Sequence, residues 1–187
     1  MRGMLLSLFL ALAWSAVNGH AESASSLEYR VKAVFLLNFA KFTQWPSQAF
    51  ENDRSPIVIC ILGEDPFGAV MEETIKGETV DGRKLKIKRC KEPAEVDGCQ
   101  ILFIKGMNQE RMAQVLRKME GSNVLTVGES GAFLDAGGVI AFVMEQNKVR
   151  FEINETASER AGLKISSKLL SLARAVRTMP DADNGSK

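Results

Sequence analysis

Three cysteines and a single histidine are the side chains of this sequence best suited to redox, metal or nucleophilic chemistry. The histidine, His20, lies close to the N-terminus. The cysteines Cys60, Cys90 and Cys99 are far apart and lack the C-x-x-C spacing of zinc sites and thioredoxin-type redox centres. An odd number of cysteines in an oxidising compartment usually forms one disulfide and leaves one thiol. The cysteines therefore predict a structural bridge, and no metal ligands.

The sequence alone allows three pairings of these cysteines, and strand placement favours one of them. Cys60 lies within the apolar run PIVICIL, and Cys99 directly precedes the apolar run QILFIK. Two strands that are neighbours in a sheet can bring such positions within the short Cα separation that a disulfide requires. Cys90 lies in the polar stretch KIKRCKEP, so we interpret it as the free thiol. The alternative is three buried, reduced cysteines.

The first 21 residues have the layout of a secretory signal peptide. Arg2 precedes an apolar run over Met4–Val17, which is too short for a comfortable membrane span. Gly19 and Ala21 are small residues at the −3 and −1 positions of a cleavage site. Cleavage after Ala21 would also remove His20. We therefore expect an exported chain without imidazole, most simply in a bacterial periplasm.

A chain without histidine is poorly equipped for the common catalytic sites. Neither a Ser-His-Asp nor a Cys-His arrangement is possible in it. Glu64 and Asp65 follow a predicted strand, but Asp65 is better explained as a helix cap. The glycine-containing stretches GEDPFG and GESGAFLDAGG lack G-x-G-x-x-G and Lys-Ser/Thr, which favours tight turns over phosphate sites. We predict no enzyme, no cofactor and no metal; a secreted enzyme with a histidine-free site is the remaining catalytic hypothesis.

The charge balance and the hydropathy of the sequence narrow the class of protein further. The chain has 24 basic and 23 acidic residues, and removal of Arg2 with the signal peptide leaves the two signs balanced. A balanced chain gives no support for nucleic-acid binding, which needs a concentrated basic surface. After the signal peptide, the sequence has no run of about 18 continuous apolar residues, so we expect no transmembrane anchor. We expect one domain over residues 22–177 and a flexible polar tail over residues 178–187.

Periodicity predicts helices that alternate with strands. The first helix, over residues 27–43, has Ser26 as its N-cap and an apolar face formed by Leu27, Val31, Val34, Phe35, Phe39 and Phe42. Strands are predicted at 56–63, 82–90, 100–105 and 124–127, with helices at 65–76 and 108–119 between them. A hairpin turning at 145–148, a helix from the cap Asn154 to Ala161, and a last helix from the cap Ser166 through Val176 complete the chain. This order predicts an α/β domain with a central, mostly parallel sheet flanked by helices, ending in a hairpin and helices.

Two places could form a partner surface. Alternation in VRFEI places Arg150 and Glu152 on one face of a strand and Phe151 on the other, so one face at a sheet edge could meet a partner. A hairpin packed on the core is the interpretation that we favour. Trp45 lies in a polar linker and would either anchor a partner or plug the end of the first helix; we favour the plug.

Six blocks in order resemble the YfiR-like family of periplasmic proteins. They are EYRVKAVFLLNFAKFTQWP, ICILGEDPFG, DGRKLKIKR, GCQILFI, LTVGESGAFLDAGGVIAFV and VRFEINETASERAGLKISSKLLSLAR. The resemblance implies a non-enzymatic regulator, seen as a homodimer, that represses a YfiN-type inner-membrane diguanylate cyclase by binding its periplasmic part. A YfiB-type outer-membrane lipoprotein would sequester the regulator, and the resulting cyclic di-GMP favours biofilm formation. The family pattern also includes a disulfide at the positions of Cys60 and Cys99.

The chain departs from some relatives, and the resemblance leaves a second function open. Leu134 and Ala141 occupy the region where some relatives have a second cysteine pair, and Cys90 is an additional cysteine. Some YfiR-like domains are linked to histidine kinases. The alternative function is therefore a periplasmic small-ligand sensor coupled to a histidine kinase.

Overall fold

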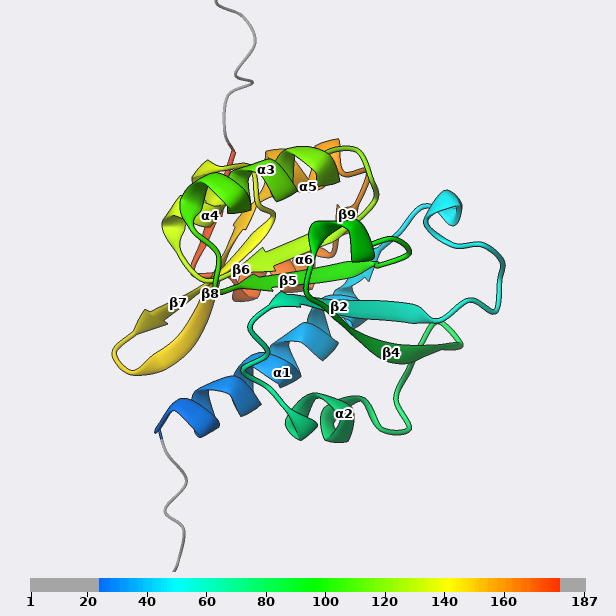
Figure 1. The fold of residues 1–187 in the computed structure, drawn as a ribbon, viewed down its shortest axis with the longest axis horizontal. Coiled ribbons are helices and arrows are strands. Elements are labelled where there is room, and N and C mark those ends of the chain that lie inside the picture. The colour runs from blue at the N-terminus through cyan, green and yellow to red at the C-terminus, as the bar shows by residue number, and fades with distance from the viewer. Residues whose placement is uncertain (1–23, 179–187) are drawn as a thin grey trace, which may run out of the picture.

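The computed structural model describes residues 24–178, which fold around an eight-stranded sheet (Figure 1). The helices are α1 (Ala24–Phe42), α2 (Ala69–Ile75), α3 (Gln109–Met119), α4 (Gly131–Asp135), α5 (Glu155–Arg160) and α6 (Ser167–Leu172), with 3-10 turns at Ser47–Ala49 and Pro93–Glu95. The strands are β1 (Thr43–Gln44), β2 (Ile57–Gly63), β3 (Thr79–Val80), β4 (Arg83–Cys90), β5 (Ile101–Lys105), β6 (Leu125–Gly128), β7 (Ile140–Glu145), β8 (Lys148–Asn154), β9 (Lys164–Ile165) and β10 (Ala175–Arg177). The predicted α/β class is confirmed.

The sheet is mostly parallel, as the sequence predicts. Its strand order is β10-β8-β7-β6-β5-β2-β4-β3, and the strands from β7 to β4 in that order run parallel. Strand β2 lies between β4 and β5, and Ile59 is paired with Ile87 on one side and with Ile101 on the other. Both faces of β2 are covered, which explains why its sequence is continuously apolar instead of alternating.

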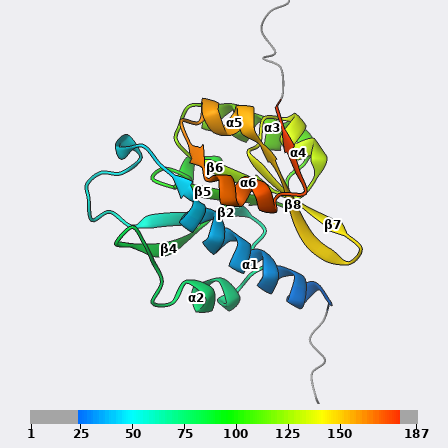
Figure 2. The same cartoon turned by 180° about the vertical axis from the view of Figure 1, so that it is seen from behind.

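Helices cover both faces of the sheet (Figures 1 and 2). Helices α1, α2 and α6 contribute Phe39, Met71 and Leu169 to one buried cluster. Helices α3 and α4 contribute Leu116 and Phe133 to a second cluster on the opposite face. Alternate β2 residues enter the two clusters, so the sheet forms the middle layer of three.

The helix starts differ from the predictions at two places. Helix α1 begins at Ala24, so Ser26 lies inside the helix and its predicted capping role is wrong. Helix α2 begins only at Ala69. The Asp65 carboxylate instead accepts hydrogen bonds from the amides of Phe67 and Gly68, at 2.9 and 3.2 Å. Asp65 therefore closes a turn before the helix, because the positive φ of Gly68 (52°) interrupts the helical backbone.

The C-terminal segment is where prediction and structure differ most. The hairpin of β7 and β8 is confirmed, and Gln146 and Asn147 have the two positive φ angles (49° and 59°) of a tight hairpin turn. The caps at Asn154 and Ser166 are also confirmed. The predicted helix through Val176 is wrong, because α6 ends at Leu172 and the chain returns as strand β10 parallel to β8.

Two predictions lie outside the described residues. The signal peptide and its cleavage after Ala21 fall within residues 1–23, and all but the first residue of the predicted tail falls within residues 179–187. Between residues 24 and 178, no helix combines the length and the apolarity needed to cross a bilayer.

Candidate functional site

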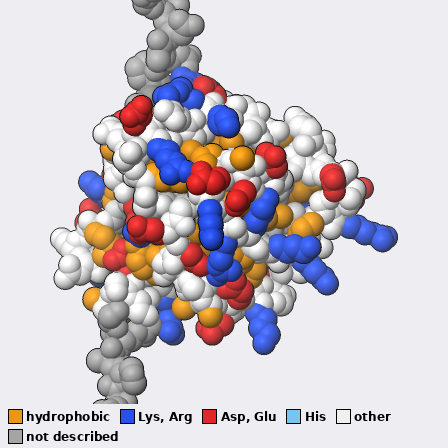
Figure 3. Space-filling view, in the orientation of Figure 1, with side chains coloured by type: hydrophobic (Ala, Val, Ile, Leu, Met, Phe, Trp, Pro, Cys, Tyr) orange, Lys and Arg blue, Asp and Glu red, His pale blue; other side chains and the backbone are white. Residues whose placement is uncertain are grey.

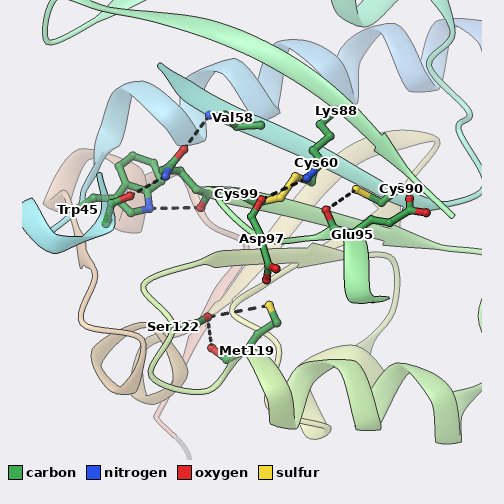
Figure 4. Close-up of a disulfide and its surroundings, with 12 residues drawn as sticks. Trp45, Val58, Cys60, Lys88, Cys90, Glu95, Asp97, Cys99, Met119 and Ser122 are labelled. Atoms are coloured by element: carbon green, nitrogen blue, oxygen red, sulfur yellow. Dashed lines mark hydrogen bonds between the residues drawn. A yellow bond between two sulfur atoms is a disulfide. The ribbon is translucent and has the colours of Figure 1, made fainter. Parts of the chain in front are cut away.

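A disulfide joins Cys60 of β2 to Cys99, just before β5 (Figure 4). The Cα atoms of the two cysteines are 5.9 Å apart, within the usual range for a bridge. The parallel pairing of β2 with β5 brings them together, as the sequence argument expects. Because both cysteines are buried, at 0% and 4% exposure, the bridge fastens the interior of the sheet and does not form a reactive surface group.

The third cysteine, Cys90, is a buried free thiol at the end of β4. Its Sγ lies 3.5 Å from the carbonyl oxygen of Glu95, to which the thiol donates a hydrogen bond (Figure 4). Burial raises the pKa of this thiol above its ordinary value, and the nearby Lys88 opposes that shift only in part. Cys90 is therefore held in its less reactive, protonated form.

The structure corrects the predicted partner surface on β8, because two of its residues, Phe151 and Glu152, lie in the interior. Phe151 is 1% exposed and packs edge-on against Phe39, with ring centroids 5.1 Å apart. Glu152 is 3% exposed and forms ion pairs with Arg174, at 2.9 Å, and with Arg177. Arg174 precedes β10 and Arg177 ends it, in a segment that the sequence analysis placed in a helix as far as Val176. Neither Phe151 nor Glu152 is available to a partner.

Arg150 and Trp45, the other two residues of the predicted partner surface, differ from Phe151 and Glu152 in that neither is fully buried. Arg150 is exposed on the hairpin, 4.0 Å from Glu145. Trp45 is half-buried against the core after α1, and its Nε1 donates a hydrogen bond to the carbonyl oxygen of Gln100 at 3.2 Å (Figure 4). This position agrees with a plug at the end of α1 rather than with an anchor for a partner.

An apolar stripe on the outer side of α1 is the most unusual surface of the described chain. Leu27, Val31 and Val34 are 55%, 37% and 47% exposed and recur at helical spacing. The sequence analysis assigned them to one wide face with Phe35 and Phe39, but only the aromatic side of that face meets the core. Exposed apolar residues that gather in this way typically mark an interaction site. We refer to Leu27, Val31 and Val34 as the α1 stripe.

The β7–β8 hairpin lies beside the N-terminal half of α1 in both ribbon views (Figures 1 and 2). Between them is a depression of about 400 Å³, lined among others by Glu28, Lys32, Ser130 and Met144. Met144 is 50% exposed and adds a further apolar side chain next to the helix. The surface thus combines apolar contact area with charged groups at its base, as protein interfaces commonly do.

A buried ion cluster supports this depression from below. The Nζ atoms of Lys32 and Lys105 donate to the two carboxylate oxygens of Glu129, at 2.6 and 2.7 Å. Lys32 also pairs with Glu28 one turn earlier on α1, and Tyr29 donates to Glu129 at 3.3 Å. Because the Lys32 side chain is only 4% exposed, its charge depends on these carboxylates. The cluster ties α1 to the carboxyl ends of β5 and β6.

The charged forms of Glu129 and Lys105 are favoured within this cluster. Burial alone would raise the pKa of Glu129, but hydrogen bonds from Lys105 and Lys32 lower it below its ordinary value. Burial would lower the pKa of Lys105, yet its bonds to Glu129 and Tyr29 raise it. Two lysines and two carboxylates compensate one another, so this arrangement positions α1 and offers no free acid or base for catalysis. Within residues 24–178, no group of three His, Cys, Asp or Glu residues could hold a metal ion.

Sequence reasoning missed this cluster because its members are distant in the chain. Lys32 and Glu129 are 97 positions apart, and neither belongs to a recognisable motif. The only local signal was the position of Lys105 and Glu129, which lie at the carboxyl ends of predicted buried strands. In α/β sheets that edge is where functional side chains usually gather.

These features define an α/β domain whose sheet is fastened by a disulfide and whose first helix presents apolar side chains to solvent. The chain belongs to the YfiR/HmsC-like family, whose family model matches residues 29–174. Membership confirms the resemblance seen in the sequence and supports a periplasmic regulator in cyclic di-GMP signalling, in a family that is regulatory and non-catalytic.

Two solved structures are similar in fold. An ABC domain from Streptococcus pneumoniae, described in complex with L-Trp, has a TM-score of 0.51 and 12% identity, over 80% of this chain and 60% of that one. A conserved domain protein from Vibrio cholerae O1 biovar El Tor has a TM-score of 0.47 and 10% identity, over 64% of this chain and 54% of that one. This chain therefore spans about 60% of the length of the pneumococcal domain, and the likeness to it concerns the fold alone.

Proposed function

We propose that this protein represses a YfiN-type membrane diguanylate cyclase by binding its periplasmic part, and thereby limits cyclic di-GMP and biofilm formation. The working form is the domain over residues 22–177, after export and cleavage behind Ala21. Family membership over residues 29–174 is the observation that supports this function most strongly. The α1 stripe and the neighbouring depression are the surface that we assign to the cyclase.

The proposed mechanism is a shift of the cyclase population towards its inactive conformation. A bound protein can shift such an equilibrium only by the difference between its affinities for the two states. Covering three half-exposed aliphatic side chains contributes roughly 2–4 kcal/mol, about half of the value for burying them completely. If that contact forms only with the inactive state, the equilibrium shifts by about 30- to 1000-fold. A contact over the α1 stripe is therefore of the magnitude that effective repression requires.

The other two expected partners, an outer-membrane lipoprotein and a second copy of this protein, would act through the same surface. A YfiB-type outer-membrane lipoprotein that covers the α1 stripe would compete with the cyclase and release it. In a homodimer, each copy would present one stripe, and a two-headed repressor would engage a dimeric cyclase at two places.

Deletion of the gene, with measurement of cellular cyclic di-GMP, tests this function. The cyclic di-GMP level is expected to rise in the deletion strain and to return to normal when the wild-type gene is restored. Leu27→Asp should fail to restore the level, because it places a charge in the contact surface. Leu172→Asp is the matched control, since Leu172 is equally exposed (54% against 55%) but lies on α6. An unchanged level in the deletion strain, with the cyclase present, would refute the proposal.

The depression next to α1 favours one second candidate, a small-ligand sensor coupled to a histidine kinase. It has room for a molecule of amino-acid size and presents Lys32 and Glu28 to its interior. Because the pneumococcal domain is described with L-Trp, this amino acid is a reasonable first probe. Calorimetry should detect binding that Met144→Asp weakens. If L-Trp does not bind at millimolar concentration, the reason for choosing this ligand disappears. If the neighbouring gene encodes a diguanylate cyclase, the repressor function is favoured over the ligand sensor.

A further inference from the structure

Strand β4 has a free edge along most of its length. On one side, Leu85–Cys90 pair with Ile57–Leu62 of β2. On the other side, strand β3 reaches only Arg83 and Lys84. Among residues 24–178, no strand or turn forms backbone hydrogen bonds with the outer edge of Leu85–Cys90. Outward amide and carbonyl groups in this stretch are therefore available to another extended chain.

A groove of about 700 Å³ runs along this free edge, between α2 and β4. Its lining includes the apolar residues Ile75, Leu85 and Ile87 and the charged residues Glu72, Glu73, Lys76, Glu78, Lys84 and Lys86. Leu85 and Ile87 point to the α2 side of the sheet, because they pair with Ile57 and Ile59, whose side chains enter the core on that side. Alternate side chains of an added strand would enter this groove.

The opposite face of the same edge carries a row of cations. Lys84, Lys86 and Lys88 alternate with the apolar residues and are all exposed. In Figure 3, Lys and Arg side chains project into solvent on the side of the molecule where β4 lies. Lys88 donates to the carbonyl oxygen of Asp97, whereas Lys84 and Lys86 form no ion pair with any described residue. Both arginines of the strand are engaged, because Arg89 pairs with Asp65 at 2.6 Å and Arg83 donates to the carbonyl oxygen of Ser55 at 2.8 Å.

We propose that the β4 edge binds an extended acidic peptide segment of a partner protein by adding it as a further strand. The segment alternates acidic residues, which face Lys84 and Lys86, with aliphatic residues, which enter the groove beside Leu85 and Ile87. Backbone hydrogen bonds would supply affinity and the alternation would supply specificity, as in other cases of strand addition. This inference goes beyond the proposed repression, because it concerns a separate surface and does not require a cyclase.

Charge decides which chain can occupy the edge. A second copy of β4 would bring Lys84 and Lys86 against their own counterparts, and lysines on edge strands oppose such self-pairing. An acidic strand meets the same lysines favourably. The row of lysines therefore opposes the pairing of two copies through this edge and favours an acidic partner.

The test uses the mature protein and a labelled six-residue peptide that alternates glutamate with valine. Fluorescence anisotropy should show saturable binding that weakens as salt is raised, since exposed charges are screened. A peptide with lysine in place of glutamate should not bind. The double variant Lys84→Glu/Lys86→Glu should weaken binding by about tenfold or more. Lys118→Glu is the control, because Lys118 is also exposed but belongs to α3 and not to the β4 edge.

Hydrogen exchange distinguishes strand addition from a loose charge contact. Bound peptide should slow amide exchange within Leu85–Lys88 and leave the amides of α3 unchanged. Three results would overturn the proposal: no binding at millimolar peptide, equal binding by the double variant and the wild type, or protection only outside β4. Because no cyclase is present, each result is independent of the proposed repression.

Discussion

Removal of the Cys60–Cys99 bridge is expected to destabilise the domain by about 4 kcal/mol. The bridge closes a loop with a sequence separation of 39. In the chain-entropy model, a loop of that length restricts the unfolded chain by about 13 cal/mol/K, which is about 4 kcal/mol at 25 °C. For a domain of this size, the loss corresponds to a decrease of about 8–16 °C in the unfolding temperature.

The assay is denaturant unfolding of the mature protein and of the variant Cys60→Ala/Cys99→Ala. Alanine avoids placing an unpartnered hydroxyl in the interior, because both positions are buried. Cys90→Ala is the control, since it removes a buried sulfur and leaves the bridge intact. Non-reducing mass mapping should find Cys60 joined to Cys99. A loss below about 1 kcal/mol, or a bridge that includes Cys90, would refute the reasoning.

Three further predictions concern the interior. Gly138→Ala should cost about 1–3 kcal/mol in denaturant unfolding, because a Cβ there would lie 2.1 Å from the buried ring of Phe133; an unchanged midpoint would contradict this packing. The pKa of Glu129 is lowered in the fold, so its contribution to stability is present above its ordinary pKa of 4.5 and disappears as the pH falls through the folded value. Unfolding of Glu129→Gln measured from neutral to acidic pH should therefore depend less on pH than wild type, and equal slopes would contradict the ion cluster. Cys90 should resist a thiol reagent in the folded protein and react after unfolding, because burial raises its pKa; rapid labelling of the native protein would show that the end of β4 opens.

The sequence predicted what depends on local pattern. Continuous apolar runs identified the buried parallel strands, and the predicted caps Asn154 and Ser166 do begin their helices, because each side chain accepts a hydrogen bond from a backbone amide of the first turn. The disulfide followed from strand placement, because parallel neighbours bring Cys60 and Cys99 together.

Features that depend on tertiary contacts were missed. A leucine-rich segment with a capping serine predicts a helix through Val176, but pairing with β8 makes the end of that segment a strand. The same return of the chain brings Arg174, just before this strand, and Arg177, within it, to the buried Glu152. The α1 stripe could not be recognised either, because Leu27 has the periodicity of a core residue and its 55% exposure becomes visible only in the packed structure.

The most direct test of the account measures cyclic di-GMP synthesis by the membrane diguanylate cyclase of the same genome, reconstituted in lipid nanodiscs. Purified mature protein is titrated against it, in its wild-type form and as Leu27→Asp. We predict a saturable fall in the synthesis rate with wild type, and a curve displaced to higher concentration with Leu27→Asp. A rate that stays constant while the protein is bound would contradict repression, and equal curves for both forms would contradict the role of the α1 stripe.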